Sequence, residues 1–234
     1  MKIKCNKSDL LHGVNTVSKA VPTRTTMPIL ECILLEATEE LSLTANDMEL
    51  GIESKVQAQI LEPGSVALDA KIFSEIVRKL PDSEVTIEID ENNQATIICE
   101  KSKFNISGRS GYEFARLPHI EKKQLISISS FHLKEIIRQT IFSISDNENN
   151  KMMTGELFDI QGDEFKVVSL DGHRISMRKM NLDKSYDDIK VVVPGKTLIE
   201  ISKILTGEME DVVNIYFSDK HILFELDKSI VISR

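Results

Sequence analysis

The chain has 234 residues, of which 41% are hydrophobic and 28% charged, and its formal net charge is −8 at pH 7. Glycine and proline number only 10 and 6, so the composition excludes a low-complexity, collagen-like or linker-rich protein. The absence of a long apolar run excludes a chain of membrane-spanning helices. The negative charge argues against a nucleic-acid partner only if it is spread evenly, because phosphates are bound by local groups of Lys and Arg.

The amino-terminal segment and the cysteines indicate an intracellular protein. Residues 1–6 alternate in polarity like a strand and lack the apolar core of a secretion signal. Cys5, Cys32 and Cys99 are odd in number and far apart, so they predict buried, reduced thiols and not disulfides or a metal motif. We therefore expect a cytoplasmic protein.

The sequence contains an internal duplication. Residues 70–80 (AKIFSEIVRKL) parallel residues 195–205 (GKTLIEISKIL), at an offset of about 125 residues. Two further pairs have nearly the same offset: residues 43–47 with 167–171, and residues 105–107 with 231–233. The repeats predict two copies of one unit, residues 1–121 and 122–234, joined at the polar stretch 119–124.

Apolar residues at 3.6-residue spacing predict two helices in each copy. In chain order they cover residues 7–20 with a Ser8 cap, 71–80 before Pro81, 131–142 after Ser130, and 196–205 before Gly207. The apolar face predicted for the second helix consists of Ile72, Ile76, Val77 and Leu80. Each helix carries a small net positive charge, whereas the rest of the chain is strongly acidic.

Alternating segments between the helices predict antiparallel strands. Examples are residues 85–89, 96–99 and 222–226, and turn residues lie at 91–93 and 218–220. Connections this short cannot make a parallel crossover. The predicted fold is therefore α+β, with two tandem domains that each pack two helices on one face of curved antiparallel sheets, as internal βαβββ repeats. Helices that share a face would present a basic surface, although Lys and Arg are also common on simply solvated helix faces.

Motifs of catalysis and metal binding are incomplete. Residues 195–197 (GKT) lack the earlier glycine of a phosphate-binding loop, since that position is Lys190. Residues 108–111 (GRSG) are one residue short of a nucleophile elbow. The five histidines have no metal-ligand spacing. We expect no catalytic residue, no metal and no cofactor.

The most distinctive local string is LDGHRI at residues 170–175. Its Asp-Gly pair marks a tight turn between strands, and the His-Arg pair that follows projects polar atoms from the turn. The first copy has Met-Glu-Leu at residues 48–50 instead, so the string is a specialisation of the second copy. Asp47 and Asp171 occupy equivalent positions, and each is predicted to accept hydrogen bonds from its own backbone in a turn.

Several of these segments together resemble one family. They are the opening strand and helix through Leu10, residues 24–30 (RTTMPIL), 41–47 (LSLTAND), 113–118 (EFARLP) and 171–174 (DGHR). In this order they are similar to the bacterial β sliding clamp, the processivity subunit of DNA polymerase III. The resemblance covers the whole chain. It implies three such repeats in the family subunit, which closes as a head-to-tail homodimer into a six-domain ring around duplex DNA.

Only the first two repeats are present here. The sequence stops on a predicted strand, which suggests a shortened chain. In the family, the first domain of one protomer meets the third domain of the other, so the resemblance implies that this chain does not close the usual ring.

The resemblance also implies two sets of site residues. The expected DNA-binding residues are Arg24, Lys71, Asn147, Lys151 and Met152, with the last three in a loop that spans residues 147–152. The expected partner-peptide wall is Met153, Leu170, Gly172, His173, Arg174 and Ile175. In the family this wall binds short peptides rich in Gln, Leu and Phe from the catalytic subunit of DNA polymerase III, the clamp loader and repair proteins. The opposite wall belongs to the third repeat.

The expected function is that of a non-catalytic processivity factor. It would encircle double-stranded DNA without reading its sequence and tether the polymerase and other replication proteins. Two alternatives are a protein-interaction module without a DNA role and a hydrolase or nucleotidyltransferase that uses Asp171 and His173. The enzyme alternative lacks a nucleophile, a metal cluster and a phosphate loop.

Overall fold

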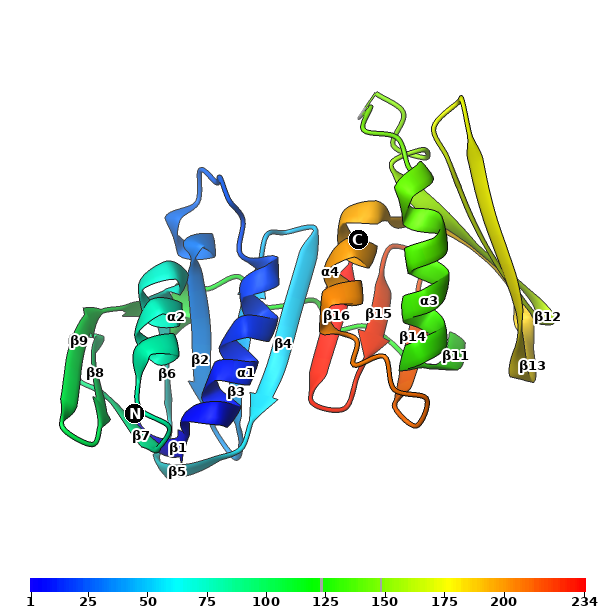
Figure 1. Cartoon of the computed structure of the whole chain (residues 1–234). Coiled ribbons are helices and arrows are strands. Elements are labelled where there is room, and N and C mark those ends of the chain that lie inside the picture. Colours follow the sequence, from blue (N-terminus) through cyan, green and yellow to red (C-terminus); the bar gives the residue numbers. More distant parts are fainter. Residues whose placement is uncertain (123, 148) are drawn as a thin grey trace. The chain divides into compact units, whose positions relative to one another are not determined.

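The computed structural model describes residues 1–122, 124–147 and 149–234. The chain forms two compact units (Figure 1). Unit 1 consists of residues 1–118 with 228–230, and unit 2 consists of residues 119–227 with 231–234. Within the described ranges, every helix is too short or too polar to cross a membrane.

In unit 1 two helices lie side by side on one face of a sheet (Figure 1). They are α1 (Lys7–Val17) and α2 (Ala70–Lys79), and the hydroxyls of Ser18 and Ser74 lie 3.3 Å apart where α1 ends. The sheet beneath them has the order β10-β6-β2-β3-β4, and a second sheet has the order β5-β1-β7-β8-β9. The strands are β1 (Lys2–Asn6), β2 (Cys32–Ala37), β3 (Leu41–Asn46), β4 (Leu50–Val56), β5 (Ala58–Glu62), β6 (Gly64–Asp69), β7 (Glu84–Ile89), β8 (Gln94–Cys99), β9 (Ser102–Ser107) and β10 (Arg109–Ser110). Short 3-10 turns are η1 (Ser18–Ala20), η2 (Pro28–Glu31) and η3 (Gly111–Glu113).

The second copy repeats this plan. Helices α3 (Ser130–Thr140) and α4 (Gly195–Ile204) contact each other and pack on the long strands β12 and β13. The Lys134 ammonium donates to the carbonyl of Leu205 at 2.8 Å, which ties the two helices together at the end of α4. The other elements are β11 (Gln124–Ser129), η4 (Ile141–Ser143), β12 (Gly155–Leu170), β13 (Ile175–Pro194), β14 (Val212–Phe217), β15 (Ile222–Glu225) and β16 (Ser229–Ser233). The predicted α+β fold with two helices in each copy is confirmed.

Strands β12 and β13 each correspond to two strands of unit 1. Residues 155–160 of β12 pair with 189–194 of β13, whereas residues 164–170 pair with 175–181. Phe158 and Phe165 would lie about 23 Å apart along a straight strand. Their ring centroids are 5.1 Å apart, so β12 folds back on itself at Gly162, whose φ is +61°. The glycine permits this left-handed turn at little cost.

The predicted apolar face of the second helix is partly wrong. Phe73 and Val77 are fully buried, whereas Ile72 is 49% exposed. Phe73, Val77 and Leu80 are spaced i, i+4 and i+7, so they share one face of α2, and this larger face is the one that meets the sheet. Ile72 lies outside that stripe.

Two predicted helix caps are also wrong. The N-cap of α1 is Asn6, because β1 leads directly into the helix and places Ser8 inside the first turn. The N-cap of α3 is Ser129, whose hydroxyl accepts the backbone N–H of His132 at 3.2 Å, whereas Ser130 is already helical. A cap position depends on where the preceding strand ends, and residue type alone did not define that end.

The two copies differ at the outer edge of their first strand. Strand β1 pairs with β7 on one side and with β5 on the other. The equivalent strand β11 pairs with β14 and ends its sheet, in the part of the chain that is described. On its outer side the Ser127 N–H donates to the Tyr186 hydroxyl at 3.2 Å instead of to a strand backbone. Unit 2 is therefore more open at this edge.

Candidate DNA-binding and peptide-binding surfaces

The two predicted DNA-binding cations of unit 1 have exposed side chains that do not bond to other described residues. Arg24 lies in the connection between η1 and η2, and Lys71 lies in the first turn of α2. Both are exposed, and neither forms an ion pair or a hydrogen bond with any described residue. Asp69, two residues before Lys71, caps the helix by accepting the Ile72 N–H at 2.8 Å. Both cations are available to phosphate oxygens.

Most cations on the helices of unit 2 are already paired. Arg138 donates to the Glu135 carboxylate through Nε at 2.8 Å and Nη2 at 2.7 Å, and this contact lowers the pKa of Glu135. Lys203 pairs with Glu200 at 2.7 Å, and Lys134 is held by the end of α4. The net positive charge counted from the sequence is therefore less available on α3 and α4 than on α2.

The predicted DNA-facing loop of unit 2 is closed by its own hydrogen bonds. The Ser145 N–H donates to the Met153 carbonyl at 2.8 Å, and the Asn150 N–H donates to the Asn147 carbonyl at 3.2 Å. Asn147, Lys151 and Met152 are exposed at its surface. Glu148, which falls inside the predicted loop, lies outside the described residues.

Asp171 organises the turn that joins β12 to β13. Its Oδ1 accepts the backbone N–H groups of His173 at 3.0 Å and Arg174 at 3.1 Å, and its Oδ2 accepts Arg174 Nε at 2.8 Å. The bond from the His173 backbone is the main cause of the lowered pKa of Asp171. Asp47 accepts the N–H groups of Glu49 and Leu50 in the same way, at 2.9 and 2.6 Å. The predicted pair of self-bonded turn aspartates is confirmed.

The predicted peptide wall has two differently oriented parts. The Arg174 guanidinium lies 5.9 Å from the Phe142 ring centroid, and the Ser176 hydroxyl donates to the Gln139 carbonyl at 2.8 Å, so both side chains point toward α3 and η4. Side chains alternate along a strand. Ile175 and Met177 therefore point the opposite way, and they are 72% and 58% exposed.

The remaining predicted wall residues differ in burial. Met153 and Leu170 are half-buried, whereas Gly172 and His173 are exposed. Gly172 has φ +90°, a left-handed conformation that favours glycine. Residues 170–175 thus place apolar side chains beside one guanidinium and one imidazole at a single turn, a combination that suits recognition of a short peptide.

Sequence reasoning missed two exposed apolar residues here. Phe142, 58% exposed, follows α3 and is far in sequence from the residue it faces, so no local pattern connected it to Arg174. Met177 could have been found, because it lies two residues beyond Ile175 on a predicted strand and must share its face.

The turn does not have the geometry of a hydrolase. A hydrolytic Asp-His pair needs the carboxylate to orient the imidazole ring. Both oxygens of Asp171 are instead held by backbone N–H groups and by Arg174. Among the described residues, no cluster of His, Cys, Asp and Glu could hold a metal ion.

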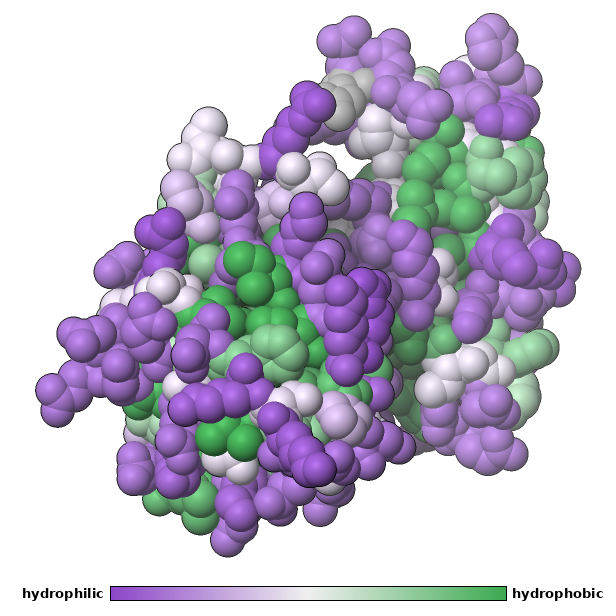
Figure 2. All heavy atoms as spheres, turned by 60° about the vertical axis from the view of Figure 1, so that its left-hand side comes forward, coloured by the Kyte–Doolittle hydropathy of each residue, from purple (hydrophilic) through white to green (hydrophobic). Residues whose placement is uncertain are grey.

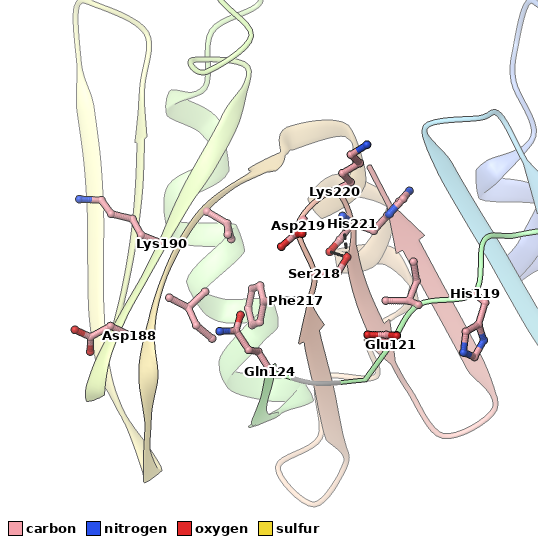
Figure 3. A pocket seen from close by; sticks show the side chains of 13 residues that line it. His119, Glu121, Gln124, Asp188, Lys190, Phe217, Ser218, Asp219, Lys220 and His221 are labelled. Atoms are coloured by element: carbon pink, nitrogen blue, oxygen red, sulfur yellow. Dashed lines mark hydrogen bonds between the residues drawn. The ribbon is translucent and has the colours of Figure 1, made fainter.

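Unit 2 also contains a cleft of about 760 Å³ that the sequence did not predict (Figure 3). It lies beside the open edge of β11, and its lining comes from residues 119–121 with Gln124, residues 188–191 of β13 and the turn at residues 217–221. In Figure 3, Asp188 and Lys190 point away from Gln124 and Phe217. The cleft contains none of the predicted site residues. It is assembled from three distant segments, so local patterns carried no signal for it.

The comparison with known families covers nearly the whole chain. Residues 1–118 match the family described as DNA polymerase III beta subunit, N-terminal domain, and residues 127–234 match its central domain. The beta sliding clamps of Bacillus subtilis and Halalkalibacterium halodurans are 37% and 36% identical to the chain over its full length. The chain spans 64% of the length of each of these relatives.

Solved structures agree with this assignment. A crystal structure described as a DNA polymerase III beta subunit, from Eubacterium rectale, is 60% identical, with a TM-score of 0.98 over the whole chain and 64% of its own length. The Bacillus subtilis sliding clamp superposes with a TM-score of 0.96 and the same coverage. A sliding clamp from Pseudomonas aeruginosa bound to griselimycin is 26% identical, covers the same shares and has a TM-score of 0.92. The chain therefore belongs to the DNA polymerase III beta subunit family and carries its N-terminal and central domains.

Proposed function

We propose that the chain acts as the DNA-holding and partner-binding portion of a cytoplasmic processivity clamp. It binds double-stranded DNA without reading its sequence, and it tethers the catalytic subunit of DNA polymerase III, the clamp loader and repair proteins. It carries out no catalysis itself. One observation supports this most directly. Arg24 and Lys71 are exposed and have no ion-pair or hydrogen-bond partner among the described residues, in a chain whose net charge is −8.

Loose DNA binding follows from this charge distribution. A clamp that slides needs contacts to phosphates and not to bases, because base contacts would fix it at one sequence. Arg24 and Lys71 in unit 1 and Asn147, Lys151 and Met152 in unit 2 are the proposed DNA-facing residues. Lys151 suits a phosphate, and the apolar Met152 beside it fits the sugar–phosphate surface by van der Waals contact.

The second proposed surface binds partner peptides. Met153, Leu170, Gly172, His173, Arg174 and Ile175 form its wall in unit 2. Exposed apolar area flanked by Arg and His suits a peptide that brings Leu and Phe side chains together with a Gln amide. Phe142 extends the wall on the side of Arg174.

The proposed domains are residues 1–121 and 122–234. In the full-length family protein, unit 1 would contact the third domain of a second copy and so form the homodimer ring. Exposed apolar side chains support this, because β9 ends its sheet in the described part of the chain and carries the exposed Phe104, and the neighbouring helix α2 carries the exposed Ile72. Figure 2 shows hydrophobic surface surrounded by hydrophilic atoms on this side of unit 1.

Charge reversal tests the DNA surface. We expect K71E to weaken binding to a double-stranded DNA fragment several-fold at low salt, because it replaces a phosphate-binding cation by an anion. Fluorescence anisotropy with a labelled duplex measures this. The matched control is K220E, which makes the same change of charge at an exposed turn beside the cleft of unit 2. Equal losses in both variants would show a response to net charge alone and would contradict the proposed surface.

A further inference from the structure

Glu156 is a buried acid that the proposed function does not use. It lies in β12 of unit 2, its side chain is 0% exposed, and neither carboxylate oxygen has a hydrogen-bond partner among the described residues. Burial without a partner penalises the ionised form strongly. Burial accordingly raises the pKa of Glu156 to about 7, and the nearby Thr140 hydroxyl lowers it only in part, because that hydroxyl donates its proton to the Ile136 carbonyl and not to the carboxylate. The side chain can therefore change charge near neutral pH.

The surroundings of Glu156 contain several polar groups. The Thr140 hydroxyl donates to the Ile136 carbonyl at 2.7 Å, and the Thr140 carbonyl accepts the Ser169 hydroxyl at 2.5 Å. Ser143, in η4 against β12, has a buried hydroxyl that no described residue contacts by a hydrogen bond. Ionised Glu156 would need hydrogen-bond donors. To supply them, the Thr140 hydroxyl would have to leave the Ile136 carbonyl, the Ser143 hydroxyl would have to turn toward the carboxylate, or water would have to enter.

This buried cluster is connected directly to the proposed peptide wall. Thr140 ends α3 and is followed by η4, which carries Phe142 against Arg174. Ser169 precedes the wall residue Leu170 at the end of β12. The Ser176 hydroxyl also holds the Gln139 carbonyl, so the end of α3 is joined to β13 beside the turn.

The other charged groups on the elements around Glu156 either pair with another residue or lie away from Glu156 along the paired strands. η4 carries none, and Glu156 pairs across β12 and β13 with Val193. On β12, Asp159 is paired with Lys166 at 2.8 Å. The titratable residues of the elements packed against Glu156 are His132, Lys134, Glu135 and Arg138 on α3, Lys196, Glu200 and Lys203 on α4, and Lys190 as the nearest on the paired segment of β13.

We propose that Glu156 is a proton-controlled switch beneath the peptide wall. When it is neutral, the end of α3 and η4 pack tightly on β12 and hold Phe142 in place against Arg174. When it is ionised, the Thr140 and Ser143 region opens to hydrate the carboxylate, and the wall becomes less ordered. Peptide binding then weakens as pH rises through neutrality. The effect on binding rests on the proposed function, whereas the opening of η4 does not.

Hydrogen exchange of the 234-residue chain tests the opening directly. At about pH 8.5, residues 136–144 should exchange several-fold faster than at about pH 6 after correction for the intrinsic pH effect, and α1 in unit 1 should not. In E156Q, which is neutral at every pH, this difference should vanish. E156M provides a second variant without a titratable group if the amide destabilises the core. E164Q is the matched control, since Glu164 is an exposed, ion-paired carboxylate on the same strand, and it should behave like the parent chain. A pH response that persists in E156Q and E156M would overturn the proposal.

Peptide binding separates this proposal from the proposed function. A labelled synthetic peptide rich in Gln, Leu and Phe should bind the parent chain several-fold more weakly at about pH 8.5 than at about pH 6, and should bind E156Q equally at both. His173 is present in both proteins, so the difference between their pH responses reports Glu156 alone. An opening seen by exchange with no peptide binding at either pH would contradict the proposed peptide wall and support the switch. Equal binding by the parent chain at both pH values would overturn the coupling and leave the peptide wall standing.

Discussion

Three carboxylates of unit 2 show that the local partner decides the protonation of an acid. Glu156 and Asp159 are both buried in β12. Asp159 accepts the Lys166 ammonium at 2.8 Å, and this contact lowers its pKa, whereas burial without a partner raises that of Glu156. Asp171 is less buried, and the hydrogen bond from the His173 backbone N–H is the largest cause of its lowered pKa. The burial of a carboxyl group therefore does not by itself predict whether that group is neutral.

The raised pKa of Glu156 makes stability depend on pH. The folded state holds a proton up to about pH 7, whereas the unfolded chain releases it near its ordinary value of 4.5, so the folded state binds more protons between these values. The free energy of unfolding should therefore fall as pH rises across this window, by roughly 3 kcal/mol, and stay level above it. Urea denaturation at a series of pH values measures this, and E156Q should lack the fall. Parallel curves for both proteins would contradict the buried acid.

At the scale of elements, the duplication preserved structure and changed the surface. The turns at Asp47 and Asp171 follow equivalent strands and use the same aspartate bonds to the backbone. Only the second carries the Gly-His-Arg string and faces Phe142. The first copy thus provides an internal reference for what the turn does structurally.

Replacing each turn aspartate separates structure from binding. D171A removes the bonds that order residues 171–174, and we expect it to lower stability by about 1 kcal/mol and to weaken binding of a Gln-, Leu- and Phe-rich peptide several-fold. D47A should have a similar effect on stability and none on the peptide. Thermal unfolding and fluorescence anisotropy measure the two effects. Should D47A weaken the peptide as much as D171A, the peptide wall would not lie at the second turn.

At the scale of the whole molecule, net charge and binding surface are separate properties. The chain has a net charge of −8, yet Arg24 and Lys71 on unit 1 have no ion-pair or hydrogen-bond partner among the residues that the structure describes. Each helix pair covers one face of a sheet in its own unit. A few separated cations give weak, mobile attraction to a polyanion, and this suits a protein that holds DNA without stopping on it.

This charge pattern predicts how DNA binding responds to salt and sequence. Affinity for a duplex should fall strongly between about 50 mM and about 200 mM NaCl, because binding releases condensed counterions. Two duplexes of equal length and unrelated sequence should bind equally, since phosphate contacts carry no sequence information. Titrations by anisotropy test both statements. Binding that resists salt or prefers one duplex would indicate base contacts and contradict sliding.

Local order was predictable because it depends on neighbours in the chain. Apolar spacing indicated all four helices, and Asp-Gly after an alternating run indicated the β12–β13 turn. The repeated segments indicated two similar units. The segments similar to sliding clamps led to the predicted site residues, and the structure places Arg174 and Leu170 at one turn.

Tertiary contacts decided the rest. Ile72 and Phe73 are adjacent and both apolar, and only the position of the sheet determined which one is buried. Lys134 and Arg138 both contributed to the positive charge counted from the sequence. In the fold, Lys134 donates to the Leu205 carbonyl and Arg138 donates to the Glu135 carboxylate. No sequence pattern singled out Glu156, and its complete burial became visible only in the folded chain. Spacing along the chain determines helices and strands, whereas burial and pairing arise between segments that are distant in sequence, so only the folded chain determines which charges are free.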